Sequence, residues 1–167
     1  MFERGVTMPE YEKQMAEALA LARRAASEGE IPVGCVITDE SGAVIGVGRN
    51  ERESLHDATA HAEIAAIRMA CRHRGNKLLD GCTLHVTLEP CPMCAGAILN
   101  ARIPVVVYGA REEKSGCCGS VIDLFTENFG FHPKVYGGVL REECSGELRK
   151  FFEALRAGSP YEGERHR

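Results

Sequence analysis

Residues 83–108 read TLHVTLEPCPMCAGAILNARIPVVVY and predict a strand, a helix and a second strand in succession. The first strand is expected from Thr83 to Leu88, where apolar and β-branched residues dominate until Pro90 ends the run. CPMCAGAILNAR then has the small residues that let a helix pack closely, and Val105 to Tyr108 form the next strand. This stretch therefore predicts a tightly packed βαβ unit.

The chain before this unit predicts a helix, a hairpin and a second helix. The first helix opens at Pro9 and ends near Gly29. Val33 to Thr38 and Ala43 to Val47 are the hairpin strands, separated by the turn residues DESG. A polar loop from 50 to 59 leads into the helical pattern HAEIAAIRMACRHRGN, which Gly75 is expected to cap.

The chain after the unit begins with a polar, turn-like stretch from Gly109 to Gly119 that is long enough to suggest a functional loop. A last strand is expected around Val135 and Tyr136. Helical spacing of apolar residues from 140 to 155 predicts an amphipathic C-terminal helix. The order of elements predicts an α/β fold in which helices cover both faces of a mixed five-stranded sheet. We expect one domain over residues 1–158 and a polar tail over 159–167.

Composition places the chain among ordinary globular domains, because 44% of its 167 residues are hydrophobic and 26% are charged. The first residues have no apolar core of signal-peptide length, and no segment is apolar enough to span a membrane. We therefore expect a cytoplasmic protein whose eight cysteines are mostly reduced thiols. The net charge of -4 gives no global attraction for a polyanion, so any nucleic-acid contact needs a local basic patch.

Two short motifs stand at predicted helix starts and together indicate a metal site. They are His61-Ala62-Glu63 and Pro90-Cys91-Pro92-Met93-Cys94. Two cysteines separated by two residues can direct both sulfurs at one ion, and His61 adds a third ligand. This donor set favours zinc over magnesium or calcium, which prefer oxygen. Three protein ligands leave a position open for water, whose pKa zinc lowers to about 7.

Glu63 lies two residues after His61 and is the expected proton shuttle between the water and a base. A lone CxxC is also typical of structural zinc and of redox pairs. A structural site would normally contain a fourth Cys or His, and a redox pair would leave His61 and Glu63 without a role. The combined pattern favours catalysis.

The full pattern H-x-E…P-C-x-x-C is the signature of zinc deaminases, and the chain resembles the cytidine-deaminase-like superfamily. It resembles most the branch of tRNA-specific adenosine deaminases, which convert wobble adenosine to inosine. The likeness extends to IPVGCVI, GRN, HDATAHAEI, VTLEPCPMCAGAI, YGAR and KSGCCGS, and so covers nearly the whole chain.

The resemblance implies a three-layer α/β/α deaminase sandwich, one Zn²⁺ per subunit and a homodimer. It implies an adenine pocket bordered by His61 and by four further residues: Val33, Asn50, Ala62 and Leu88. The amide of Asn50 can donate and accept hydrogen bonds at once, which suits a purine edge. Glu89 is expected to orient the site without binding the metal.

The resemblance also implies that a tRNA anticodon loop is the partner. Its splayed bases and phosphates call for arginine, lysine and exposed aromatic side chains. The expected contacts lie in the loop after 109 and on the last helix: Arg111, Lys114, Arg149, Lys150, Phe151 and Phe152.

Several residues depart from the usual pattern of the family. They are Ala58 in place of Pro, Glu112 where Asp is common, the pair Cys117 and Cys118 where two alanines are common, and Gly130-Phe131-His132-Pro133. These departures fall in loops expected to meet RNA and leave the zinc motifs intact. Two alternatives therefore stay open: a deaminase of a free base or nucleoside such as guanine, adenine or cytosine, and a zinc-stabilised RNA-binding or scaffold protein.

Overall fold

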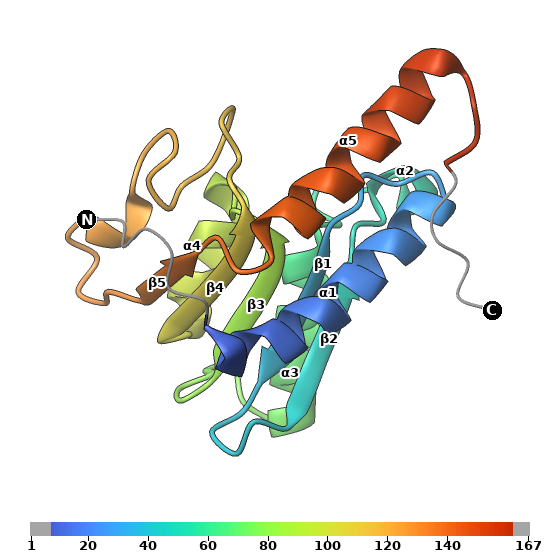
Figure 1. The fold of residues 1–167 in the computed structure, drawn as a ribbon. Coiled ribbons are helices and arrows are strands. Elements are labelled where there is room, and N and C mark those ends of the chain that lie inside the picture. The colour runs from blue at the N-terminus through green and yellow to red at the C-terminus, as the bar shows by residue number, and fades with distance from the viewer. Residues whose placement is uncertain (1–7, 162–167) are drawn as a thin grey trace.

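The computed structural model describes residues 8–161, in which helices cover both faces of a five-stranded sheet (Figure 1). The strands are β1 (Gly34–Thr38), β2 (Val44–Arg49), β3 (Thr83–Leu88), β4 (Val105–Ala110) and β5 (Lys134–Gly137). They lie in the order β2-β1-β3-β4-β5. β1 is antiparallel to β2 and β3, whereas β3, β4 and β5 are parallel. The predicted mixed sheet and its βαβ unit are confirmed.

Two helices cover each face of the sheet. α1 (Pro9–Ser27) and α5 (Arg141–Ala157) lie on one side, and α3 (Ala62–Arg74) and α4 (Pro92–Ala101) lie on the other (Figure 1). The buried side chains divide accordingly into two clusters. Alternate residues of a strand point to opposite faces, so Val36 joins the cluster under α1 while Cys35 and Ile37 join the cluster under α3. The three-layer α/β/α architecture is thereby confirmed.

Glycines let the helices approach the strands at backbone distance. A Cβ on Gly34 would lie 1.9 Å from the carbonyl oxygen of Ala18 in α1, and one on Gly48 would lie 2.1 Å from that of Ala62 in α3. Any larger residue would force the layers apart. The close contact at Gly48 fixes the first turn of α3 against the end of β2, and this is where the chemical groups gather.

The structure differs from the prediction mainly in the loop from 50 to 59. This segment contains a one-turn helix, α2 (Arg52–Leu55), which ends at His56 with a left-handed backbone conformation (φ 50°). A short 3-10 turn, η1 (Leu124–Thr126), also precedes β5. No buried apolar side chain anchors α2, so apolar periodicity does not reveal it.

The predicted ends of the other elements differ from the observed ones by a few residues. β2 continues to Arg49, and α1 stops at Ser27 because Gly29 takes a φ of +83°. Within residues 8–161, no helix is long and apolar enough to cross a membrane. The single domain over 1–158 stays a prediction, and residues 162–167 of the predicted tail lie outside the described residues.

Candidate zinc centre and substrate pocket

The starts of α3 and α4 bring three metal-binding side chains together. His61 is the N-cap residue of α3, Cys91 is that of α4, and Cys94 lies in the first turn of α4. The Nδ1 atom of His61 lies 3.5 Å from the Sγ atom of Cys91 and 3.5 Å from that of Cys94. Sequence segments that lie 30 residues apart thus converge on one point.

These distances fit a zinc ion. With Zn–S bonds of about 2.3 Å and Zn–N bonds of about 2.0–2.1 Å, tetrahedral geometry places nitrogen and sulfur about 3.6 Å apart. All three ligand atoms lie within 4.8 Å of one another. Among the described residues this cluster holds three ligands, which is the number in catalytic sites, whereas structural sites hold four. His61, Cys91 and Cys94 therefore fit a catalytic zinc.

Cys91 already favours the thiolate that zinc needs. A hydrogen bond from the Cys94 thiol, aided by His61 and by a backbone N–H of α4, lowers the pKa of Cys91 to about 4. The same bond and burial raise the pKa of Cys94. A negative charge is thus stable at Cys91 at neutral pH, and the amides at the start of a helix support it further.

Glu63 lies in the first turn of α3 with only 3% of its surface exposed. The pKa of Glu63 is raised to about 7, mainly by burial, with the nearby Cys91 also raising it and His61 lowering it. A carboxyl group with a pKa near 7 can both take and release a proton at neutral pH, as a general acid-base catalyst must.

A pocket opens beside these groups and collects the predicted base-binding residues. Its wall includes His61, Glu63 and Cys91. The same wall contains the four predicted positions: Val33, Asn50, Ala62 and Leu88. Sequence reasoning missed four further lining residues, which are Ile31, Arg52, Glu112 and Ser115. The length of the loop after 109 was the one signal for the last two.

The amide of Asn50 is held in one orientation. Its side chain is 5% exposed, and its backbone N–H donates to the carbonyl oxygen of Val33 at 3.1 Å. The Nδ2 atom donates to the carbonyl oxygen of Ile31 at 3.4 Å, and Oδ1 accepts the N–H of Arg52 at 3.4 Å. These bonds fix which side of the amide carries Nδ2 and which carries Oδ1, so the side chain presents a donor and an acceptor to the pocket in a defined orientation.

Comparison with known proteins accounts for this arrangement. Residues 8–110 match the family model for the cytidine and deoxycytidylate deaminase zinc-binding region. The chain belongs to this deaminase family. It is 44% identical to the tRNA-specific adenosine deaminase of Bacillus subtilis, over 89% of this chain and 92% of that protein.

Solved structures resemble the deaminase over most of its length. A tRNA deaminase studied for A-to-I editing at the wobble position of transfer RNA superposes with a TM-score of 0.78 at 44% identity, covering 81% of this chain and 99% of that one. The guanine deaminase of Bacillus subtilis superposes with a TM-score of 0.60 at 33% identity, covering 94% and 98%.

Two longer relatives match only in part. The tRNA(Ile)-lysidine synthases of Deinococcus deserti and Deinococcus radiodurans are 49% and 48% identical to the deaminase. The chain spans 27% and 25% of their lengths, about a quarter in each case. Most of each of those proteins thus has no counterpart in this chain.

Glu89 holds the loop that forms the far wall of the deaminase pocket. It is 2% exposed and accepts hydrogen bonds from the backbone N–H groups of Glu112 (3.0 Å), Cys118 (2.9 Å) and Ser120 (3.1 Å). The hydroxyl of Ser120 also donates to it. Gly116 is required here, because a Cβ on it would lie 2.5 Å from the Glu89 carboxyl carbon. Glu89 lines the pocket and is not one of the three grouped ligands.

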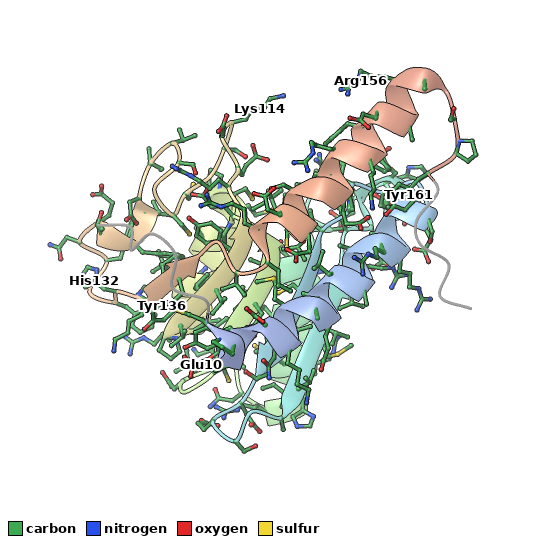
Figure 2. The ribbon with its side chains drawn as sticks, viewed as in Figure 1. Glu10, Lys114, His132, Tyr136, Arg156 and Tyr161 are labelled. Atoms are coloured by element: carbon green, nitrogen blue, oxygen red, sulfur yellow. The ribbon has the colours of Figure 1, made fainter. Side chains whose placement is uncertain are left out.

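The predicted RNA contacts divide into exposed and buried residues. Lys114 projects from the tip of the loop after β4 (Figure 2) and is exposed, as are Arg111, Arg149 and Lys150. Phe152 is 37% exposed, whereas Phe151 is 7% exposed and packs against Phe152 and Tyr161. The expectation of an RNA contact at Phe151 is corrected by this burial, and Phe152 is the aromatic side chain that the surface offers.

The positions that depart from the family pattern have ordinary structural surroundings. Ala58 is exposed, Glu112 lines the pocket, and the guanidinium of Arg102 lies 5.8 Å from the ring centre of Phe131. Cys117 and Cys118 are free thiols, 1% and 4% exposed, in the loop held by Glu89. At this exposure they pack as small apolar residues.

Proposed function

We propose that this deaminase converts adenosine to inosine at the wobble position of a tRNA anticodon. The observation that carries the proposal is the pocket shared by Asn50, Glu63 and two zinc ligands, His61 and Cys91, which joins a purine-edge donor and acceptor to a proton shuttle. The 44% identity to a tRNA-specific adenosine deaminase, over 92% of that protein, supports the choice of substrate.

The reaction replaces the 6-amino group of adenine with oxygen, consuming one water and releasing one ammonia. His61, Cys91 and Cys94 would hold a zinc ion, which would supply the Lewis acid that makes water nucleophilic at neutral pH. The two helix starts that carry these ligands fix where the attack on C6 takes place. The target base has to leave the anticodon stack to reach this depth.

Glu63 moves the protons. It takes one proton from the attacking water and delivers it to N1 of the purine, so that C6 becomes tetrahedral without a buildup of charge. It then takes the proton of the new hydroxyl and passes it to the amino group, which departs as ammonia. Each transfer needs both protonation states, and the pKa of Glu63, raised by burial to about 7, makes both available.

The walls of the pocket orient the base. The amide of Asn50 faces the purine edge, and the backbone N–H of Ala62 is the second polar contact we assign to it. Val33, Ile31 and Leu88 provide the apolar surface on which a planar ring can pack. We assign the exposed Lys114 and Arg111, on the loop after β4, to contacts with phosphates of the anticodon loop.

The test is inosine formation by zinc-loaded protein in a synthetic anticodon stem-loop with adenosine at the wobble position. Free adenosine, cytidine and guanine are run beside it. We expect inosine in the stem-loop and no turnover of the free compounds. Turnover of guanine instead would contradict the proposal and favour the alternative represented by the guanine deaminase neighbour.

We also propose that two copies of the chain associate through the surface around η1. Val121, Ile122 and Phe129 are 52%, 50% and 61% exposed there, and an adjacent groove is lined by Leu99, Leu124 and Phe131 of the same region. Large exposed apolar side chains gathered in one region are typical of interfaces. Sedimentation velocity should give a dimer for the wild type and a monomer for Ile122→Asp. A monomeric wild type at micromolar concentration would contradict this.

A cytoplasmic location follows from the same proposal. All eight cysteines are free thiols, six of them buried, and such thiols persist in reducing compartments. Cell fractionation with an antibody against the chain tests this location, and recovery outside the cytoplasmic fraction would contradict it.

A further inference from the structure

Glu30 is a buried carboxylate that the proposed chemistry does not use. It lies between α1 and β1, directly after Gly29, and only 1% of its surface is exposed. Burial of a carboxylate is costly unless its oxygens accept hydrogen bonds. The partners of Glu30 therefore indicate what the residue is for.

Both partners of Glu30 are backbone N–H groups of α2. Oε2 accepts from the N–H of Glu53 at 3.2 Å, and Oε1 accepts from the N–H of Ser54 at 2.7 Å. The side chain of Glu51, the N-cap residue of α2, makes no capping bond. A carboxylate that lies 23 residues earlier in the chain thus satisfies N–H groups that a local cap usually serves.

α2 has little else to hold it in place. None of its four residues is buried, and Leu55 is 59% exposed. The hydrophobic packing that anchors most helices is therefore missing from α2. Hydrogen bonds from a buried, charged acceptor are among the stronger polar contacts, so Glu30 is the main anchor of this turn to the sheet.

The position of α2 matters because the residues at its start form part of the pocket wall. Asn50 and Arg52 both line the pocket, and the backbone N–H of Arg52 donates to Oδ1 of Asn50. Asn50 in turn bonds to the carbonyl oxygens of Ile31 and Val33, the residues that follow Glu30. Hydrogen bonds therefore connect residues 30–33 to residues 50–54. Those that involve a charged group, the Glu30 carboxylate, are made to α2.

We infer that Glu30 is a positioning residue that fixes α2, and through it Asn50 and Arg52, against the substrate. The inference rests on the proposed function, since it takes this pocket to be the site of the base. The hydrogen bonds of the Glu30 carboxylate go to α2 and not to the metal ligands or Glu63. Its loss should weaken the fit of the substrate and leave the chemical step nearly intact.

The test compares Glu30→Gln with Glu147→Gln. Glutamine keeps the size of the side chain but replaces one accepting oxygen with an NH₂ group, so one N–H of α2 loses its partner. Glu147 is a matched control because it is also buried, at 4% exposure, and its partners are Arg23, Lys150 and Tyr161. A third variant, Glu30→Asp, keeps the charge but shortens the reach by one methylene.

Three quantities are measured on each zinc-loaded variant: KM and kcat for the stem-loop, thermal stability, and hydrogen exchange of the amides of Glu53 and Ser54. For Glu30→Gln and Glu30→Asp we expect about 10-fold faster exchange at these amides and a KM about 10-fold higher, with kcat within about 3-fold of wild type. Glu147→Gln should lower thermal stability without changing exchange in α2 or KM.

A Glu30→Gln protein that loses thermal stability but keeps wild-type KM and wild-type exchange at Glu53 and Ser54 would overturn the inference. The exchange experiment needs no substrate. Inactivity of the wild type on the stem-loop would therefore contradict the proposed function alone, while exchange at α2 would still decide whether Glu30 anchors that turn.

Discussion

The two helical layers of the deaminase use the same residue type in opposite ways. His61 begins α3 on one side of the sheet, beside two cysteines and Glu63. His85 points to the other side, under α1, where it is 2% exposed and contacts the ring of Tyr11. Burial lowers the pKa of His85 to about 4, so it stays neutral at physiological pH.

The difference shows that the chemistry belongs to helix starts and not to buried polar residues in general. The α3 and α4 layer directs two helix N-termini, with their partial positive charge, at one point, and thiolates and a proton shuttle gather there. The α1 and α5 layer packs apolar residues such as Met15, Leu19 and Cys144 on the sheet. Variants of the chemical groups in the first layer should therefore change activity, and variants of the buried apolar residues in the second should change stability.

The largest effect of a single substitution is expected for Glu63→Ala in the catalytic layer. Loss of the proton shuttle should lower kcat for the stem-loop by about 10²–10⁴-fold. The zinc content and the unfolding transition should change little, because Glu63 is not a ligand and its burial disfavours its charged form. Full activity in a zinc-loaded Glu63→Ala protein would rule out the mechanism.

Removal of zinc should abolish activity before it unfolds the protein. A chelator takes away the Lewis acid at once, whereas the sheet and both core clusters persist and lose only the binding free energy of the metal. Elemental analysis, inosine formation and the melting temperature are followed during one chelator titration. Activity that survives confirmed metal loss would contradict the assignment of the chemistry to the α3 and α4 layer. As a control, added zinc should restore inosine formation.

Met15→Ala tests the opposite layer. Met15 is fully buried between α1 and the sheet, and a cavity there should lower the free energy of unfolding by about 2–5 kcal/mol. We expect kcat and KM of the folded protein to stay at the wild-type values. Chemical denaturation gives the first quantity and stem-loop kinetics below the transition give the others. A loss of kcat without unfolding would show that α1 takes part in the site.

His85 predicts a pH dependence of stability. The unfolded chain binds a proton at this residue near pH 6.5, whereas the folded chain binds it only near pH 4. The unfolded state thus holds more protons between these values, and the free energy of unfolding should fall as pH drops through this window, by at most about 1.4 kcal/mol per unit. Denaturation curves of wild type and His85→Leu should differ in this slope. Equal slopes would contradict the assignment.

The smallest effect is expected for Lys114→Ala on the outer loop. Removing one phosphate contact should raise KM for the stem-loop by less than about 10-fold and reduce the salt dependence of log KM by about 0.7 for one charge on a single strand. kcat should not change. KM measured at several salt concentrations, with Lys77→Ala as a control on another surface loop, checks this. If the salt dependence of log KM is the same in Lys114→Ala as in the wild type, Lys114 does not contact the RNA.

The parts that the sequence predicted are those in which function follows from local spacing. His61 and Glu63, and Cys91 and Cys94, lie two or three residues apart at helix starts, so motif and geometry coincide. The anchor of α2 was beyond sequence reasoning, because Glu30 and Ser54 lie 24 residues apart and no periodic pattern links them. The choice between Phe151 and Phe152 was also out of reach, since both continue the apolar spacing of the helix and only the structure shows that Phe151 is buried.

The central claim is that water replaces the wobble amino group at the site built by α3 and α4. The most direct measurement is mass spectrometry of the stem-loop after reaction in oxygen-18 water, with wild type and Glu63→Ala compared at equal zinc content. The account predicts one oxygen-18 atom in each inosine that the wild type forms at the wobble position, and about 10²–10⁴-fold slower formation of labelled inosine by the variant. Inosine elsewhere in the loop, or equal labelling by the variant, would contradict it.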